Sequence, residues 1–117
     1  MQRIVRWGLM ALVGTALAAP FGATIAQEYP KGPVRIVVPF APGGGSDFTA
    51  RLMAQKLSER LGNPFIVENR AGAGGNLGAE TVVRSPADGY TLLLISASYT
   101  VNPSVYKLTF DPISDIT

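Results

Sequence analysis

Apolar residues gather in three short runs of the chain, each followed by small or polar residues. The runs Pro33–Phe40, Phe65–Asn69 and Tyr90–Ser96 read "PVRIVVPF", "FIVEN" and "YTLLLIS". Nearly continuous apolar segments of this length are typical of strands in a parallel sheet that is covered on both faces. The pattern therefore predicts three strands, with the first and third buried.

Two helices are expected between these strands. From Asp47, "DFTARLMAQKLSERLG" has the apolar spacing of one helix face, with Ser46 or Asp47 as N-cap and Gly62 as the end. The expected apolar stripe comprises Phe48, Leu52, Met53, Leu57 and Leu61. A shorter helix is expected from about Asn76 to Arg84. The final segment, "ASYTVNPSVYKLTFDPISDIT", is interpreted as a loop with at most one helical turn.

The order strand, helix, strand, helix, strand predicts an α/β fold with an open parallel sheet built from a βαβαβ unit. In such sheets ligands bind outside the carboxyl ends of the strands. Three loops of small residues follow these ends: Ala41–Ser46, Ala71–Gly75 and Ser96-Ala97-Ser98. We expect the three loops to meet at one edge of the sheet.

Both glycine-rich loops run directly into a predicted helix. "PGGGSD" contains Gly43, Gly44 and Gly45, and "GAGGN" contains Gly74 and Gly75. A helix start presents amide groups without intrahelical partners, and glycines leave them accessible to an anion. The loops are therefore interpreted as anion-binding cradles. The alternative is that the glycines only form tight turns between strand and helix.

Asp47 has two interpretations. As an N-cap it would occupy amide donors, and its charge would repel an anion. If Ser46 caps the helix instead, Asp47 could bind a hydroxyl, an amine or an ordered water on a ligand.

The first 26 residues resemble a secretory signal peptide. Arg3 and Arg6 precede the apolar run "GLMALVGTALAAPFGATIA", and cleavage is expected after Ala26, with Ala18 or Ala19 as alternatives. A transmembrane anchor is the other interpretation, but glycines and Pro20 interrupt the run. Export to the periplasm is therefore expected, with a mature part of residues 27–117.

Composition excludes several functions. Without Arg3 and Arg6, the ten basic residues fall to eight, which balance eight acidic ones, so no basic nucleic-acid surface is expected. The chain has no His and no Cys, which removes the usual zinc ligands and any Ser-His-Asp or Cys-His mechanism. "GAGGNLG" only approaches the dinucleotide motif G-x-G-x-x-G, and no phosphate-binding G-x-x-x-x-G-K-[ST] is present. No metal and no cofactor is expected.

Several spaced motifs resemble one family. "PFAPGGGSD", "VENRAGAGG" and "DGYTLL" are similar to motifs of the Bug family, the exported substrate-binding receptors of tripartite tricarboxylate transporters. The likeness runs from Tyr29 to Thr117. It implies a two-lobed periplasmic binding protein that closes on a small organic acid and works with the transporter's membrane subunits.

The resemblance also implies which residues bind. Family members hold a ligand carboxylate with backbone amides and ordered water at the loops of the first lobe. Carried over by position, this indicates Phe40, Ala41, Gly43, Gly44, Gly45, Ser46 and Asp47, then Ala73, Gly74, Gly75 and Asn76, then Ser96, Ala97 and Ser98. Because family receptors are about three times as long, the chain is expected to correspond to the N-terminal part of the first lobe.

Two other functions stay open at this stage. An exported α/β enzyme could use a glycine loop as an oxyanion hole, although Ser46 and Ser98 have no histidine to activate them. A truncated remnant without function is the other alternative.

Overall fold

The computed structural model describes residues 28–116. In chain order its elements are β1 (Val34–Val38), α1 (Gly45–Leu61), β2 (Phe65–Asn69), the 3₁₀ turn η1 (Ala73–Gly75), α2 (Asn76–Val83), β3 (Thr91–Leu93) and α3 (Ser98–Val105).

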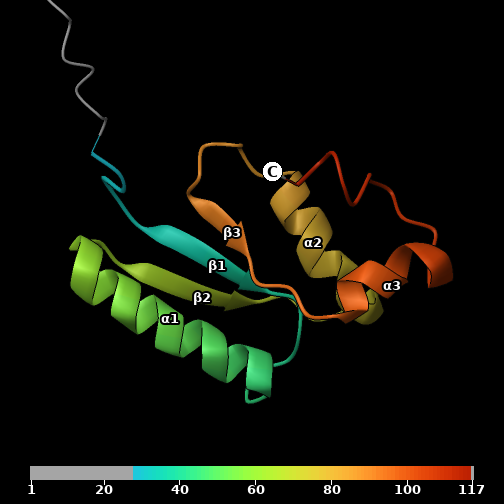
Figure 1. Ribbon diagram of the computed structural model, residues 1–117, viewed down its shortest axis with the longest axis horizontal. Coiled ribbons are helices and arrows are strands. Elements are labelled where there is room, and N and C mark those ends of the chain that lie inside the picture. Colours follow the sequence, from blue (N-terminus) through green and yellow to red (C-terminus); the bar gives the residue numbers. More distant parts are fainter. Residues whose placement is uncertain (1–27, 117) are drawn as a thin grey trace, which may run out of the picture.

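The three strands form one parallel sheet in the order β2-β1-β3. The register pairs Val34 with Phe65 on one side of β1, and Arg35 with Thr91 on the other. The chain moves from β1 to β2 through α1, and then returns across β1 to β3 through α2. Because both connections are right-handed and run in opposite directions along the sheet, the two helices lie on opposite faces. Figure 1 shows the strands between α1 on one side and α2 on the other. The predicted α/β fold with a parallel βαβαβ unit is confirmed.

The central strand β1 is buried on both faces. Val34, Ile36 and Val38 form a cluster with Phe65 and two alanines of α1. Val37, whose side chain alternates to the other face, is also fully buried. The core of the described chain therefore lies around β1, with α1 packed on one face and α2 on the other.

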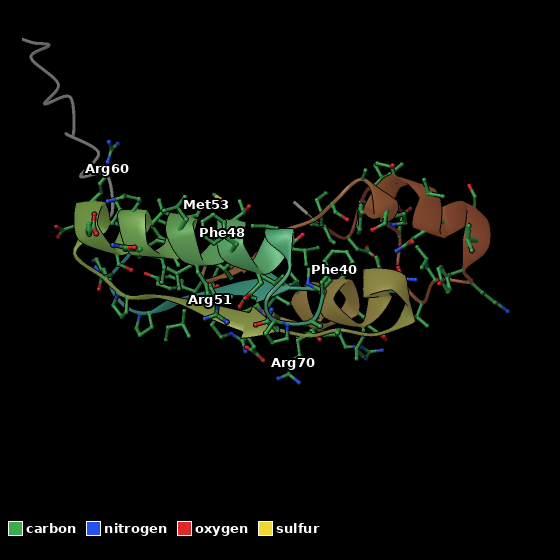
Figure 2. All side chains as sticks on the ribbon, turned by 90° about the horizontal axis from the view of Figure 1, so that it is seen from below. Phe40, Phe48, Arg51, Met53, Arg60 and Arg70 are labelled. Atoms are coloured by element: carbon green, nitrogen blue, oxygen red, sulfur yellow. The ribbon has the colours of Figure 1, made fainter. Side chains whose placement is uncertain are left out.

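The residues of α1 that pack on the sheet differ from the predicted stripe. Phe48 is 70% exposed, and Leu52, Met53 and Leu61 are all more than 40% exposed. Buried instead are Ala50 and Ala54, while Leu57 packs partly against the cluster. Figure 2 labels Phe48 and Met53 on this helix. The predicted stripe is wrong because Ala50 and Ala54, four residues apart, form a second helix face whose small side chains contact the strands.

The strand bounds are partly confirmed. β2 has its predicted bounds, whereas β1 is shorter than Pro33–Phe40. One reason is Pro39, which has no amide hydrogen with which to continue the ladder. The third strand has three residues instead of Tyr90–Ser96, and it is only partly buried, with Leu92 37% exposed. It pairs with β1 alone among the described strands, so it lies at an edge.

The structure contradicts the predicted N-cap of α1 and confirms its predicted C-terminal end. Gly44 is the N-cap, in an extended conformation, and no side chain caps the helix. The prediction of Ser46 or Asp47 as N-cap is therefore wrong. Gly62 ends the helix as predicted, with a left-handed φ of 69° and an amide bonded to the carbonyl of Ser58.

The segment after β3 contains a full helix, α3, where the sequence pattern indicated at most one turn. Pro103 and the β-branched Thr100 and Val101 make this segment a poor helix former. Tertiary contacts outweigh the weak propensity. Asn102 is buried and bonded to the loop before α2, and the hydroxyl of Tyr99 donates to the carbonyl of Pro112 at 2.9 Å.

The predicted signal peptide lies outside the described residues. Between residues 28 and 116, none of the helices has both the length and the apolar character that a membrane span requires.

Candidate functional site

A recess lies at the carboxyl ends of β1 and β3. The strand order reverses at this place, because β1 is followed in the chain by β2 on one side and pairs with β3 on the other. Ligands of open α/β sheets bind at such a point. The recess encloses about 200 Å³, including space open to solvent. Figure 1 shows the first turn of α1 and the whole of α3 at this end of the sheet. Its lining comprises Pro39, Phe40, Gly74, Gly75, Ala79, Leu93, Ile95, Ser96, Ser98, Tyr99 and Asn102.

Five residues of the predicted site line this recess: Phe40, Gly74, Gly75, Ser96 and Ser98. Gly74 and Gly75 belong to the second predicted loop, and Ser96 and Ser98 belong to the third. Phe40 is the residue before the first predicted loop, Ala41–Ser46, which contributes no lining residue. The second and third loops therefore meet at one edge as expected, and the first loop begins beside them. Phe40 packs partly against the core, and a side chain at Gly75 would contact its ring at 3.6 Å. The other residues of the predicted site lie in the same loops without lining the recess: Ala41, Gly43, Gly44, Gly45, Ser46, Asp47, Ala73, Asn76 and Ala97.

The loop before α1 keeps the donors that an anion requires. No oxygen of residues 28–116 accepts a hydrogen bond from the amides of Gly45, Ser46 or Asp47. These amides form the first turn of α1, at the positive end of the helix dipole. The glycines add no side chain that would shield them: a Cβ at Gly44 would have only the carbonyl of Ala41 nearby, at 3.9 Å.

The carboxylate of Asp47 holds this loop in place. It accepts hydrogen bonds from the amide of Gly43 at 2.9 Å, from Nε of Arg51 at 3.0 Å and from Nδ2 of Asn69 at 3.0 Å. Asn69 also donates to the carbonyl of Phe40 at 3.1 Å. Only 5% of Asp47 is exposed. Its side chain is therefore engaged by the protein, neither capping the helix nor facing the recess.

The hydrogen bond from Arg51, followed by those from Gly43 and Asn69, lowers the pKa of Asp47 from 3.8 to about 2. The carboxylate is ionised at neutral pH, and its charge is paired with the Arg51 guanidinium. A ligand anion near the first turn of α1 therefore meets an ion pair and not an isolated negative charge.

The second glycine loop differs from the first. The amides of Gly75 and Leu77 donate to the carbonyl of Gly72 at 2.9 Å and 3.4 Å, and the amide of Asn76 donates to Ala73. These three donors, which the sequence suggested for an anion, are engaged within the loop. Left-handed φ angles of 65° at Gly74 and 98° at Gly75 allow this tight arrangement. The loop thus shapes the wall of the recess.

Two serine hydroxyls belong to residues that also line the recess. Oγ of Ser96 and Oγ of Ser98 are 2.8 Å apart and share one hydrogen bond. Ser98 is also the first residue of α3. Two hydroxyls carry two hydrogens, and their mutual bond uses one of them, so one hydrogen is available to a further acceptor.

Sequence reasoning missed Asn69, Arg51 and Asn102. Asn69 and Arg51 position the first loop, and Asn102 lines the recess from α3. The motif "VENR" marks Asn69 without revealing its partner, because the partner is 22 residues away in sequence. Asn102 lies in the segment interpreted as loop, so no helical face could be assigned to it.

The residues that line the recess are all uncharged, since no Asp, Glu, Lys or Arg is among them. Within residues 28–116 there is also no group of three acidic side chains close enough to hold a metal ion. The arrangement offers hydrogen-bond donors and dipoles, which can neutralise an anion without a paired cation.

Comparison of the sequence with known proteins identifies relatives. The model of the tripartite tricarboxylate transporter family receptor matches residues 49–117, more than half of the chain. Protein BugT of Bordetella pertussis is 48% identical over 95 residues, which cover 77% of this chain and 28% of BugT.

Solved structures give the same result. The periplasmic binding protein BugD is 43% identical with a TM-score of 0.71, over 74% of this chain and 29% of BugD. MatC from Rhodopseudomonas palustris, solved with bound malate, is 37% identical with a TM-score of 0.63, over 74% of this chain and 30% of MatC.

The chain spans less than a third of the length of each of these three proteins. Over that part it shares the α/β fold of BugD, a periplasmic binding protein, as the motifs predicted. By its match to the family model, the chain belongs to the tripartite tricarboxylate transporter receptor family, the family of the Bug proteins.

Proposed function

We propose that this chain is the N-terminal part of the first lobe of an extracytoplasmic solute-binding receptor, which captures a small organic acid for a tripartite tricarboxylate transporter. The observation that carries the proposal is the uncharged recess at the carboxyl ends of β1 and β3, bordered by loops from three connections. Membership of the receptor family and the malate bound to the related MatC support an acid as the ligand. The receptor performs no chemistry and passes its ligand to membrane subunits.

The carboxylate is bound by hydrogen bonds from neutral groups. The amides of the first turn of α1 and the hydroxyl pair Ser96–Ser98 are the donors. Gly74 and Gly75 of the second glycine loop line the same recess. Hydrogen bonds to a charged group each contribute about 1.5–3 kcal/mol, so two or three suffice for a weak complex. The recess is open to solvent and has little enclosed space, so the described residues contact only part of such an acid.

Binding is tested by titrating the ¹⁵N-labelled chain with malate and following the amide resonances. We expect shifts concentrated at residues 43–47, which carry the proposed amide donors, and at Ser96, Ser98 and Tyr99, which line the recess. The variant Gly44→Val places a branched side chain beside the α1 amides without backbone strain, because Gly44 has φ −85° and ψ 175°. It is expected to weaken malate binding about tenfold, the loss of roughly one charge-assisted hydrogen bond.

The matched control is Gly32→Val. Gly32 has open space around it and lies in the segment before β1, away from the recess. This variant is expected to bind malate as the parent chain does. Equal affinity of the Gly44→Val variant and the parent would show that the loop before α1 does not hold the acid. A chain without a cooperative thermal transition would instead support a remnant without function.

Export is tested separately. The whole chain is produced in a Gram-negative bacterium, and the periplasmic fraction is analysed by mass spectrometry. A product beginning at Gln27 is expected, since Ala26 ends the proposed signal peptide of residues 1–26. Retention of the uncut chain in the inner membrane would support the anchor interpretation instead.

A further inference from the structure

Asn102 is a polar side chain with a fixed orientation in the wall of the recess. It is 6% exposed, and it lies on α3. Its Nδ2 group donates to the carbonyl of Gly74 at 2.9 Å and to Oδ1 of Asn76 at 2.8 Å. A backbone carbonyl can only accept, so the NH₂ end of the amide must face Gly74. Both of its hydrogens are then engaged.

The other end of this amide has no partner among the described residues. No donor of residues 28–116 bonds to Oδ1 of Asn102. In this part of the chain, no side-chain nitrogen or oxygen is both fully buried and unpaired. The oxygen must therefore contact solvent. Because Asn102 lines the recess, we infer that this solvent is that of the recess. Two lone pairs of an amide oxygen are thus available to a ligand.

The surrounding residues hold this oxygen in position. Asn102 bonds to Gly74, and the ring of Tyr106, one turn further along α3, lies against the same glycine, where a Cβ would contact it at 3.0 Å. The α3 face and the loop before α2 are therefore locked together at Gly74. An acceptor fixed in this way discriminates between ligands more strongly than one on a mobile side chain.

We propose that Asn102 is a specificity-determining residue, which selects an organic acid that carries a hydroxyl or ammonium donor close to its carboxylate. This inference rests on the proposed function. A ligand that enters the recess displaces the water at Oδ1. An acid without a donor leaves the oxygen unsatisfied, and this costs affinity, whereas a hydroxyl or ammonium group replaces the lost hydrogen bond.

The serine pair complements this acceptor. Ser96 and Ser98 retain one hydroxyl hydrogen for a ligand oxygen, and they line the same recess as Asn102. The recess thus offers both a hydrogen-bond donor and an acceptor. A carboxylate with a hydroxyl or an amine on the neighbouring carbon presents the matching acceptor and donor. A plain dicarboxylate presents acceptors only.

The test compares acids that differ in one group. Malate and aspartate carry a donor, succinate has the same two carboxylates without it, and 2-fluorosuccinate has a polar substituent that cannot donate. Dissociation constants come from the same resonance titration, on the whole chain as processed by the host. We expect malate or aspartate to bind about tenfold more tightly than succinate, with 2-fluorosuccinate close to succinate.

The variant Asn102→Ala distinguishes two roles of this residue: selection of the ligand, and structural support of the loop before α2. If Asn102 selects the ligand, malate and aspartate lose affinity to the level of succinate, and succinate changes little. If it only supports the loop, all four acids weaken by the same factor, and the proposal is wrong. The control Asn63→Ala makes the same chemical change beside the end of α1, where Asn63 bonds to Pro30, and it should preserve the selectivity.

The ligand series in the parent chain tests the proposal even if the Asn102→Ala variant does not fold. Equal affinity of the parent for all four acids overturns the role of Asn102 while the proposed function stands. Absence of binding for every acid overturns the proposed function and this inference with it.

Discussion

The side-chain amide of Asn69 donates a hydrogen bond of 3.0 Å to the carboxylate of Asp47, so the end of β2 holds the start of α1. The same amide donates to the carbonyl of Phe40, where the chain leaves β1. One residue of β2 thus fixes both ends of the glycine loop that carries the proposed donors.

Acid should destabilise the chain through Asp47. Its pKa is lowered from 3.8 to about 2, first by Arg51 and then by Gly43 and Asn69. The unfolded chain then binds more protons than the folded one, so the stabilisation is complete above 3.8 and is lost as pH falls towards 2. At pH 6 the Asp47→Asn variant should have a lower melting temperature than the parent chain. Its melting temperature should also fall less than that of the parent as the pH is lowered. Thermal unfolding followed by circular dichroism between about pH 6 and pH 2.5 measures this slope.

The control for this prediction is Asp88→Asn, a change of an acid outside the Asp47 network. This variant should keep the steep acid response of the parent. The same slope in Asp47→Asn and in the parent would show that the three hydrogen bonds to Asp47 do not stabilise the fold.

Two phenylalanines should respond differently to truncation. Phe65 is 9% exposed in the core cluster, whereas Phe48 is 70% exposed on α1. Phe65→Ala is expected to lower the free energy of unfolding by about 3–5 kcal/mol, and Phe48→Ala by less than about 1 kcal/mol. Urea unfolding of both variants measures the difference. A large loss in Phe48→Ala would restore the apolar stripe that the sequence suggested.

Replacing glycine by alanine should have opposite effects at the two ends of α1. Gly62 has φ 69°, so Gly62→Ala is expected to cost about 1–2 kcal/mol. Gly45 begins the helix with open space around its Cα, so Gly45→Ala is expected to stabilise the chain by about 0.4–1 kcal/mol. Chemical unfolding of the pair tests this difference in sign, and two changes of equal sign would contradict it.

Gly78 should tolerate no side chain. A Cβ at this position would lie 2.7 Å from Cβ and 2.8 Å from Cα of Pro39, because α2 approaches the end of β1 closely. Gly78→Ala is expected to cost about 1–3 kcal/mol by overpacking. The control is Gly32→Ala, with nothing within 4 Å of the added atom and little expected change. Melting curves of the two variants that coincide would show that α2 can move away without cost.

The sequence was sufficient for the α/β class and for the βαβαβ order of the elements, but not for the strand order β2-β1-β3. Runs of β-branched residues mark β1 and β2, and Gly62 marks the end of α1, because these signals are local. The loops follow the carboxyl ends of parallel strands, and this geometry alone brings Phe40, Gly75 and Ser96 to one recess.

What the sequence did not reveal depends on tertiary contacts. Size and hydrophobicity favoured Phe48 for the core, but the close approach of α1 to the sheet requires Ala50 and Ala54. The helix α3 exists despite Pro103, and only its formation brings Asn102 to Gly74. The engagement of the Gly75 amide by Gly72 depends on left-handed backbone angles that no residue pattern specifies.

The hydrogen bonds from Asn69 to Asp47 and Phe40 have a kinetic consequence for the proposed capture of a solute. Once β2 pairs with β1, the connection to α1 already has its final shape, so the entropy of ordering it is lost during folding and not at the encounter with a solute. Association at this surface should therefore proceed near the rate set by diffusion and orientation, and differences between solutes should appear in how long each one stays bound.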